Sequence, residues 1–254
     1  MERKFDPRGG AARLLAVVLA LLVWQGASMA LGNELLLASP LRTAQRLVEL
    51  VPQSRFWLTV GASFLRIVGG FLSALLLGTL LAVCSSRFPL FETLLRPYME
   101  LVQSVPVAAF IVLALLWLSA RNISFFIAFL MVLPVLYSAV LQGIHAADPQ
   151  LLEMAKLYRV PFSRRVSGIY LHALRPSLLS GCRVALGLCW KSGVAAEVIG
   201  VSALSIGGRM YDAKVMVETA ELFAWTAVVV ALSVGFSYLF RMLLEGTLRR
   251  WEGV

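Results

Sequence analysis

Charged residues are scarce in this chain of 254 residues. Asp, Glu, Lys and Arg together make up 15% of it, whereas they make up about 25% of a soluble globular protein. In their place, 59% of the residues are hydrophobic, which is more than the core of one soluble domain of this length can bury. The same composition excludes disordered, collagen-like and disulfide-rich chains. The scarcity of charge therefore indicates a protein that crosses a membrane several times.

Cysteine and histidine are also rare. The three cysteines, Cys84, Cys182 and Cys189, lie in apolar stretches, form no C-x-x-C pair and adjoin neither His145 nor His172. Zinc, iron–sulfur and thioredoxin-like sites therefore have no support, and we expect the cysteines to pack as small hydrophobic residues. The motifs G-x-x-x-x-G-K-[ST], H-E-x-x-H and G-x-S-x-G are also missing. We expect no enzymatic activity, metal or cofactor in the chain itself, so any energy from ATP must come from a partner.

Six apolar segments meet or approach the roughly 20 residues that a helix needs to cross a lipid bilayer. They cover residues 12–31, 58–84, 97–120, 123–144, 176–199 and 222–244. Because an open sheet edge would leave backbone groups unpaired in lipid, the predicted fold class is an all-α, polytopic transmembrane helix bundle. The first segment could instead be a signal peptide, since Ser28-Met29-Ala30 resembles a cleavage site, but its apolar run is longer than usual for one.

The basic residues predict the orientation in the membrane. They outnumber the acidic residues by 23 to 14, for a formal net charge of +9. They are scattered among apolar runs rather than gathered in a block, so we expect no nucleic-acid partner. Cytoplasmic loops of membrane proteins carry an excess of Lys and Arg. With residues 1–11 in the cytoplasm and six spans in residues 12–254, most basic residues fall at cytoplasmic positions, and both termini are predicted to be cytoplasmic.

Two connecting segments are longer than a turn requires. The outer one, residues 32–57, predicts a short amphipathic helix after Ser39-Pro40, which either caps the bundle or binds a partner. The inner one, residues 145–175, predicts a helix of about ten residues: Asp148 is a helix cap, Pro149 suits the first turn, and Pro161 ends the apolar periodicity. This inner helix either lies on the membrane surface or inserts into a groove on a cytoplasmic partner.

Polar residues within the spans are functional candidates, because they are costly in lipid. Arg66 either reaches the outer headgroups, forms a structural pair or faces a transport pathway. Lys191 and Glu197 fall on different faces of one helix, and partial solvation near the outer end would explain Glu197. Pro106 predicts a kink beside Gln103 and Ser104, which either exposes carbonyls to a pathway or only shapes packing.

Two further patterns predict structural contacts. Arg96 and Glu100 are spaced to form an ion pair on one helix. Small residues recur every four positions in the second span, at Gly70, Ala74, Gly78 and Ala82. This stripe allows a close helix–helix contact, either within the chain or between two copies of it.

The inner loop resembles the EAA loop of ABC-importer permeases. Glu153-Met154-Ala155 is followed by Ile169-Tyr170-Leu171 and Pro176. Met154 replaces the first alanine of that pattern, Arg159 stands at its glycine and His172 at its proline. The resemblance continues in order along the chain and is closest to the nitrate/sulfonate/taurine branch. The segments that carry it are Ser63–Phe71, Gln103–Phe110, Gly181–Gly187, Ala195–Glu197 and Leu248–Trp251.

This resemblance implies a type I ABC-importer permease fold in the inner (cytoplasmic) membrane of a bacterium. Its implied partners are a second permease copy, two cytoplasmic ATPases that use ATP and Mg²⁺, and an extracytoplasmic solute-binding protein. The helix around residues 149–160 is similar to the coupling helix that docks on the ATPase. The implied coupling residues are Glu153, Met154, Ala155, Lys156, Leu157, Arg159, Arg164 and Arg165.

The resemblance also implies import of a small solute by alternating access. A sulfonate, nitrate or taurine is favoured, and a pyrimidine vitamin precursor is a further option. Candidate pathway residues are Arg66, Gln103, Ser104, Pro106, Lys191 and Glu197. The competing class is a stand-alone secondary transporter or channel, which predicts broken spans at matching positions of two inverted halves. A non-transporting scaffold is the third class, in which the polar residues of the spans would have no role.

Overall fold

The computed structural model describes residues 7–252, and its side chains between residues 15 and 247. All regular secondary structure in the described part is helical, with no strand, so the predicted all-α class is confirmed. The predicted cytoplasmic segment 1–11 begins outside the described residues. The chain divides into two compact units: residues 1–58 with 209–228, and residues 59–208 with 229–254. Each unit is described by itself.

The first unit contains α1 (Pro7–Leu31), α2 (Pro40–Leu50) and the beginning of α11 (Thr219–Glu252). The predicted outer helix is confirmed as α2: Ser39 caps it by accepting a hydrogen bond from the Arg42 N–H at 3.3 Å, and Pro40 occupies its first position. The Trp24 indole N–H donates to the Ala38 carbonyl at 3.0 Å, and the Trp24 ring contacts Phe223 with ring centroids 5.2 Å apart. These contacts hold α1 and α11 against the segment around α2.

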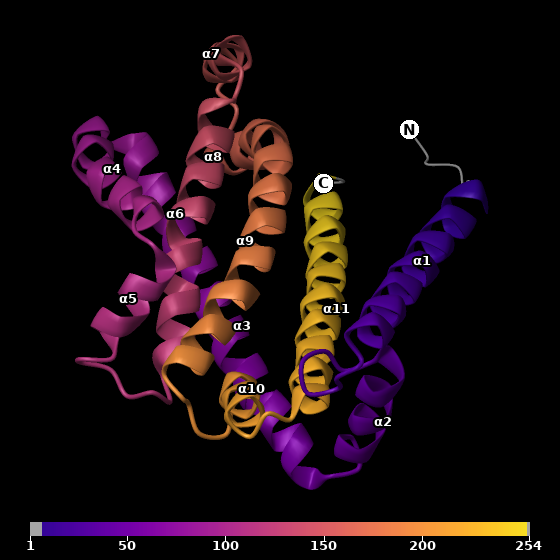
Figure 1. Ribbon diagram of the computed structural model, residues 1–254. Helices are drawn as coiled ribbons and strands as arrows, with labels where there is room; N and C mark the ends of the chain where they lie inside the picture. Colours follow the sequence, from indigo (N-terminus) through magenta and orange to yellow (C-terminus); the bar gives the residue numbers. More distant parts are fainter. Residues whose placement is uncertain (1–6, 253–254) are drawn as a thin grey trace. The chain divides into compact units, whose positions relative to one another are not determined.

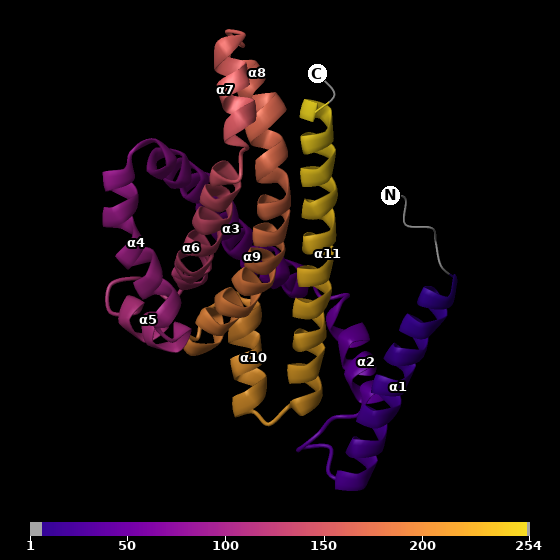
Figure 2. The same cartoon turned by 90° about the horizontal axis from the view of Figure 1, so that it is seen from above.

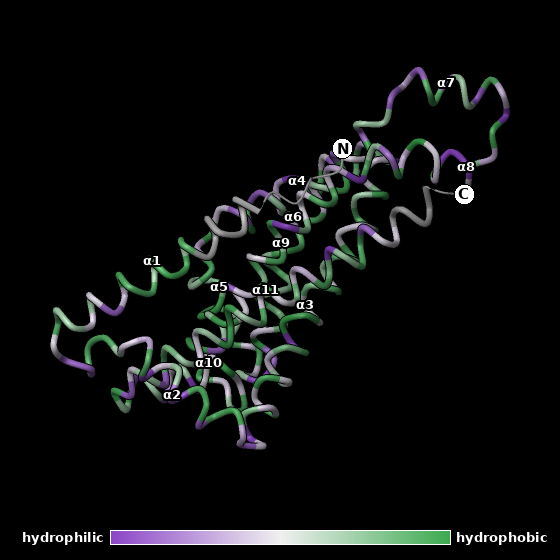
Figure 3. Tube along the Cα trace, turned by 90° about the vertical axis from the view of Figure 1, so that its right-hand side faces the viewer, coloured by the Kyte–Doolittle hydropathy of each residue, from purple (hydrophilic) through white to green (hydrophobic). Residues whose placement is uncertain are grey.

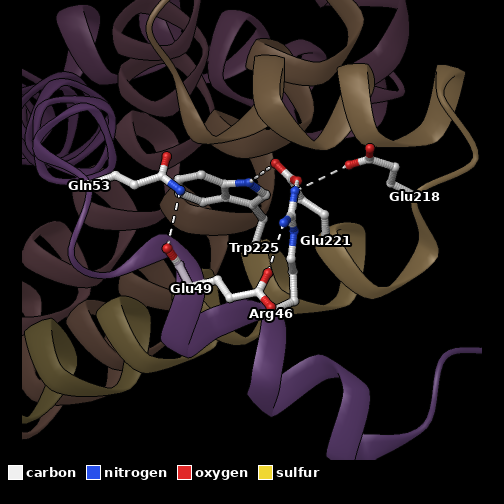
Figure 4. A network of polar contacts seen from close by, with 6 residues as sticks. All are labelled: Arg46, Glu49, Gln53, Glu218, Glu221 and Trp225. Atoms are coloured by element: carbon white, nitrogen blue, oxygen red, sulfur yellow. Dashed lines mark hydrogen bonds and ion pairs between the residues drawn. The ribbon is translucent and has the colours of Figure 1, made fainter.

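An arginine on α2 forms the polar centre of this unit (Figure 4). The Arg46 Nη2 lies 2.6 Å from Glu221 Oε2 on α11, and its Nη1 lies 2.9 Å from Glu49 Oε2. The Glu221 carboxylate also accepts a hydrogen bond from the Trp225 indole N–H at 3.2 Å. Hydrogen bonds to the Glu221 and Glu49 carboxylates raise the pKa of the Arg46 guanidinium above its ordinary value. The polar face of α2 therefore binds another part of its own unit, which supports the structural role of this helix.

The second unit is built on α6 (Ile123–His145) and α9 (Leu171–Ile199), which lie side by side in both views (Figures 1 and 2). It also contains most of α3 (Ser54–Arg87), and α4 (Pro89–Ser104), α5 (Val107–Ala114) and the larger part of α11. α10 (Ile206–Val215) begins in this unit. Apolar side chains from α5, α6 and α9 form a core that includes Ile111, Ile127 and Ala196. Cys182 and Cys189 are buried on α9, as expected for small hydrophobic residues, whereas Cys84 is exposed.

The small-residue stripe of α3 packs inside the chain. A Cβ atom at Gly70 would lie 2.5 Å from the Phe125 carbonyl oxygen and 3.1 Å from the Ala128 Cβ, both on α6. Ala74 and Ala82, on the same stripe, are fully buried. Glycine therefore lets the two backbones approach closely, and of the two interpretations of the stripe the structure supports the contact within the chain.

Three helices are long and apolar enough to cross a membrane: Ser54–Arg87, Ile123–His145 and Thr219–Thr247. The predicted span 97–120 is divided between two helices, because the chain breaks between α4 and α5 and bends there by 100°. Pro106 directly precedes α5, where its missing N–H costs no helical hydrogen bond. If this pair counts as one span, the described residues hold up to four. The total of six spans stays a prediction.

Candidate functional site

A polar cavity lies between α4, α6 and α9 in the second unit. Its volume is about 620 Å³. Its polar side chains are amides and hydroxyls, supplied by Gln103, Ser138, Gln142, Ser177 and Ser180. A second cavity of about 370 Å³ shares Gln103, Ser138 and Gln142 with the first and adds the charged side chains of Glu92, Arg96 and Glu100. Uncharged polar groups thus line a space between apolar helices and continue to a charged rim, an arrangement typical of a solute pathway in a membrane protein.

Gln103 and Ser104, two candidate pathway residues beside the α4–α5 break, have different surroundings. Gln103 lines both cavities. The hydroxyl of Ser104 donates to the Leu101 carbonyl of its own helix at 2.9 Å and is exposed. At the charged rim, Arg96 Nε lies 2.8 Å from Glu100 Oε1, so the ion pair expected from their spacing is confirmed. Gln103 is therefore the residue near the break that faces the cavity.

Lys191 is exposed on α9, in the middle of an apolar predicted span. It lies seven residues beyond the cavity residue Val184, which corresponds to about two helical turns and about 10 Å along the same face. Among the described residues, no carboxylate forms an ion pair with it. An unpaired cation at this depth is costly in lipid and is typical of a face that meets water or an anion.

Glu197 is fully buried, so the expected partial solvation of this residue is wrong. Its Oε2 atom accepts hydrogen bonds from the Ser63 hydroxyl on α3 at 2.8 Å and from the Gly207 N–H on α10 at 3.1 Å. The Ser63 hydroxyl in turn accepts from the Ile206 N–H at 2.8 Å. Glu197 thus joins the end of α9 to α3 and to the first turn of α10, where a negative charge is favoured by the helix dipole.

Arg66 forms a structural pair with this carboxylate. Its Nη1 atom lies 3.9 Å from Glu197 Oε1, and its side chain is 14% exposed. Of the roles left open for Arg66, the structure supports the pair rather than an extension to the headgroups. Lys191 and Glu197 lie on different faces of α9, as their spacing predicted. Lys191 is exposed, whereas Glu197 is buried.

The predicted helix of the inner loop is confirmed as α7 (Pro149–Leu157). The Asp148 carboxylate caps it by accepting a hydrogen bond from the Gln150 N–H at 2.8 Å. Figures 1 and 3 show α7 beyond the ends of α6 and α9, with hydrophilic and hydrophobic residues in alternation. Its apolar side chains are largely uncovered: Leu157 is 80% exposed and Tyr158 is 74% exposed, and Phe162 on the following helix α8 (Phe162–Arg165) is 69% exposed.

Arg159, which stands at the glycine position of the EAA pattern, adopts a backbone conformation that is usual for glycine. Its φ is 51°, in the left-handed region. The Val160 N–H donates to the Ala155 carbonyl at 2.9 Å, and the Arg159 N–H donates to the Lys156 carbonyl at 3.1 Å. These two bonds form a Schellman motif, in which glycine is the usual left-handed residue. The turn after α7 therefore keeps its geometry although arginine replaces glycine.

Other predicted coupling residues lie on the same protruding segment. Met154 is 52% exposed and Ala155 is buried. The Arg165 guanidinium lies 5.8 Å from the centre of the Phe162 ring, which fixes it beside the exposed apolar side chains. A π-helical turn (Val166–Tyr170) then leads into α9. Such turns are often found at functional sites.

Sequence reasoning missed most of the cavity residues and the Ser63 contact. Single serines in apolar helices carry no motif. Their helical spacing is a usable signal, because Ser138 and Gln142 are four residues apart on α6, and Ser177 and Ser180 are three apart on α9. Each pair therefore lies on one helix face, and the two faces meet at the cavity.

Long apolar helices beside a polar cavity are features of a membrane transport component. The chain belongs to the family of binding-protein-dependent transport system inner membrane components, whose model matches residues 74–250. These are the membrane permease components of ABC importers, so the resemblance inferred from the sequence is confirmed.

Individual relatives cover most of the chain. It is 28% identical to SsuC of Bacillus subtilis (strain 168), a permease protein named for transport of aliphatic sulfonates, over 94% of this chain and 86% of SsuC. It is 25% identical to the taurine transport system permease protein TauC of Escherichia coli (strain K12), over 94% of this chain and 88% of TauC. It is 26% identical to the bicarbonate transport system permease protein CmpB of a Synechocystis strain, over 75% of this chain and 70% of CmpB.

Proposed function

We propose that this chain forms, with a second copy, the pathway of an importer that carries a small oxyanion across a bacterial inner membrane by alternating access. A separate binding protein delivers the solute, and two cytoplasmic ATPases that use ATP and Mg²⁺ supply the energy. Residues 1–11 and 145–175 are cytoplasmic in this proposal, and residues 12–254 form the membrane domain. The substrate class is suggested by the sulfonate, taurine and bicarbonate names of the relatives.

One structural relation carries this proposal: the two helices that flank α7 also line the polar cavity. α6 ends at His145 just before α7, and α9 follows it after residue 170. α6 contributes Ser138 and Gln142 to the cavity, and α9 contributes Ser177 and Ser180. A force on α7 is therefore transmitted along rigid helices to the cavity walls. The exposed Leu157 and Tyr158 offer an apolar surface that fits a groove on an ATPase.

We expect Leu157→Asp to uncouple the importer. A charge at this position would have to be buried in the ATPase groove, and loss of such an anchor residue costs about 2 kcal/mol or more, or roughly thirtyfold in affinity. The measurement is co-purification with the partner ATPase, together with solute-stimulated ATP hydrolysis in proteoliposomes.

Two matched variants test this interpretation. Leu157→Met keeps an apolar side chain at the site and should assemble normally. Leu36→Asp adds the same charge at an exposed leucine in the predicted outer loop and should also leave the ATPase bound. If Leu157→Asp assembles and hydrolyses ATP like these controls, α7 is not the coupling helix.

We assign Gln103 and Lys191 to the solute pathway among the six candidates. Gln103 lines the cavity, and Lys191 lies on the face of α9 that continues from it. Pro106 lies at the break between α4 and α5, beside Gln103, and so shapes the cavity wall. Ser104 lies in the exposed turn next to it. Arg66 and Glu197 are assigned to the buried pair instead.

Lys191→Gln should lower oxyanion uptake by about tenfold, because the cation raises the local concentration of an anionic solute in a low-dielectric passage. The ATPase activity of the assembled complex without solute should be retained. Uptake of labelled sulfonate, taurine and bicarbonate into proteoliposomes measures the effect. Lys191→Arg keeps the charge and should restore most of the uptake. Equal uptake by the wild type and Lys191→Gln would remove Lys191 from the pathway.

A further inference from the structure

A groove in the second unit lies between α9 and α11 and shares no residue with the polar cavity. Its volume is about 330 Å³. Most of its walls are hydrocarbon, from side chains such as Leu179, Leu186, Val234 and Leu244. Two arginines also line it, Arg183 on α9 and Arg241 on α11. An apolar groove that also holds two basic side chains matches an amphiphile that carries a negative charge.

The two arginines line the groove from opposite walls. α9 and α11 run in opposite directions side by side (Figures 1 and 2). The groove runs along α9 from Leu179 to Gly187 and along α11 from Ser233 to Leu244. Arg183 lies midway along the α9 wall of the groove, and Arg241 lies on the part of the α11 wall nearer the α7 loop. The end around Gly187 and Ser233 is the one farther from the α7 loop.

Neither arginine is satisfied by a carboxylate in direct contact. Among the side chains that the structure describes, none forms a hydrogen bond or an ion pair with Arg183. Arg241 forms one long ion pair, with its Nε atom 3.9 Å from Glu245 Oε1, and both side chains are about half exposed, so its Nη donors stay available. Arginine within a span is costly unless it is paired. The two guanidinium groups therefore present unused hydrogen-bond donors within an apolar groove.

We propose that this groove binds an anionic phospholipid from the leaflet on the α7 side, which is the cytoplasmic leaflet in the topology proposed above. Its phosphate lies between Arg183 and Arg241, because guanidinium groups suit phosphate oxygens in bidentate geometry. One acyl chain follows the apolar wall toward Leu186 and Val234. Basic pockets between membrane helices on this side bind anionic headgroups. The lipid would hold α9, which lines the pathway, against α11.

The test uses the purified chain in detergent with a photoactivatable phosphatidylglycerol and the matching phosphatidylcholine. We expect phosphatidylglycerol to label peptides of α9 and α11 and to raise the melting temperature, with phosphatidylcholine at least about tenfold less effective. The double variant Arg183→Gln/Arg241→Gln should bind phosphatidylglycerol at least about tenfold more weakly. Arg183→Lys/Arg241→Lys keeps both charges but not the bidentate geometry, so it should bind more strongly than the double glutamine variant and more weakly than the wild type, which separates loss of recognition from loss of folding.

Arg87→Gln is the matched control. Arg87 is an exposed arginine at the end of α3, on the same predicted side of the membrane, and it lies outside the groove. Its replacement should leave the labelling unchanged. Equal labelling by the two lipids, or wild-type labelling of the double glutamine variant, would overturn the proposal. A second copy of the chain that covers the groove would exclude the photolabel from α9 and α11, and that result would overturn it as well.

Discussion

Replacement of Glu197 by alanine is expected to leave little folded permease. The carboxylate accepts hydrogen bonds from Ser63 and Gly207 and faces Arg66. Its removal leaves a largely buried guanidinium without its counter-charge and two buried donors without an acceptor. Loss of one partner of a buried ion pair costs about 3–5 kcal/mol, which is a large part of the stability of a typical domain. The yield of monodisperse protein in detergent and its melting temperature measure the loss.

A double-mutant cycle separates the charge from the hydrogen bonds. Glu197→Gln keeps an acceptor for Ser63 and Gly207 but removes the charge, so it should be less damaging than alanine. Arg66→Met should be destabilising alone and much less so beside Glu197→Gln, because the remaining partner no longer carries an unpaired charge. If Glu197→Ala folds normally and loses only transport, Glu197 belongs to the pathway and not to a structural pair.

Helix starts were predictable because capping is local. Ser39-Pro40 and Asp148-Pro149 each place a side-chain acceptor before a proline that suits the first helical turn. The structure confirms both caps, at α2 and α7. The turn after α7 also follows from local backbone geometry, although Arg159 rather than glycine adopts the left-handed conformation. Interactions within a few residues decide these features, so the sequence contains nearly all the information needed.

The break of the third predicted span was not predictable in the same way. A proline predicts a kink, because it removes one backbone hydrogen bond, but it does not set the direction or size of a bend. The 100° bend is accompanied by packing of α5: Ile111 and Ala114 join a core with Ile123 on α6 and Ala196 on α9. Ala196 is far away in the sequence, and no local pattern identifies it as a partner of α5.

The candidate functional site was also only partly predictable, because some of its contacts join helices that are distant in the sequence. Sequence reasoning selected Gln103, Lys191 and Glu197 because polar residues are unusual in apolar spans. It could not predict the hydrogen bond from Ser63 to Glu197, since this contact joins two helices that are distant in the chain. It also treated Glu197 as partly solvated because of its position near a span end, whereas α10 covers it. Burial depends on how a chain folds back on itself, which composition and spacing do not determine.

The second large effect is expected for Gly70→Leu. A Cβ atom at Gly70 meets two backbone atoms of α6, the Phe125 carbonyl oxygen at 2.5 Å and the Phe129 nitrogen at 3.1 Å. A backbone cannot move aside as a flexible side chain does, so α3 and α6 must separate. Overpacking of this kind costs about 1–3 kcal/mol or more, and the separation also uncovers buried residues such as Ala74. The melting temperature in detergent should fall sharply.

Gly61→Leu on the same helix is the matched control, because a Cβ atom at Gly61 meets no atom within 4 Å. Its melting temperature should stay close to that of the wild type. The pair of variants also distinguishes the two roles considered for the small-residue stripe. A contact between two copies predicts that Gly70→Leu yields a stable monomer that no longer dimerises, whereas the contact within the chain predicts an unstable monomer. Because the nearest atoms to Gly70 belong to α6 of the same chain, we expect folding, and not only assembly, to fail.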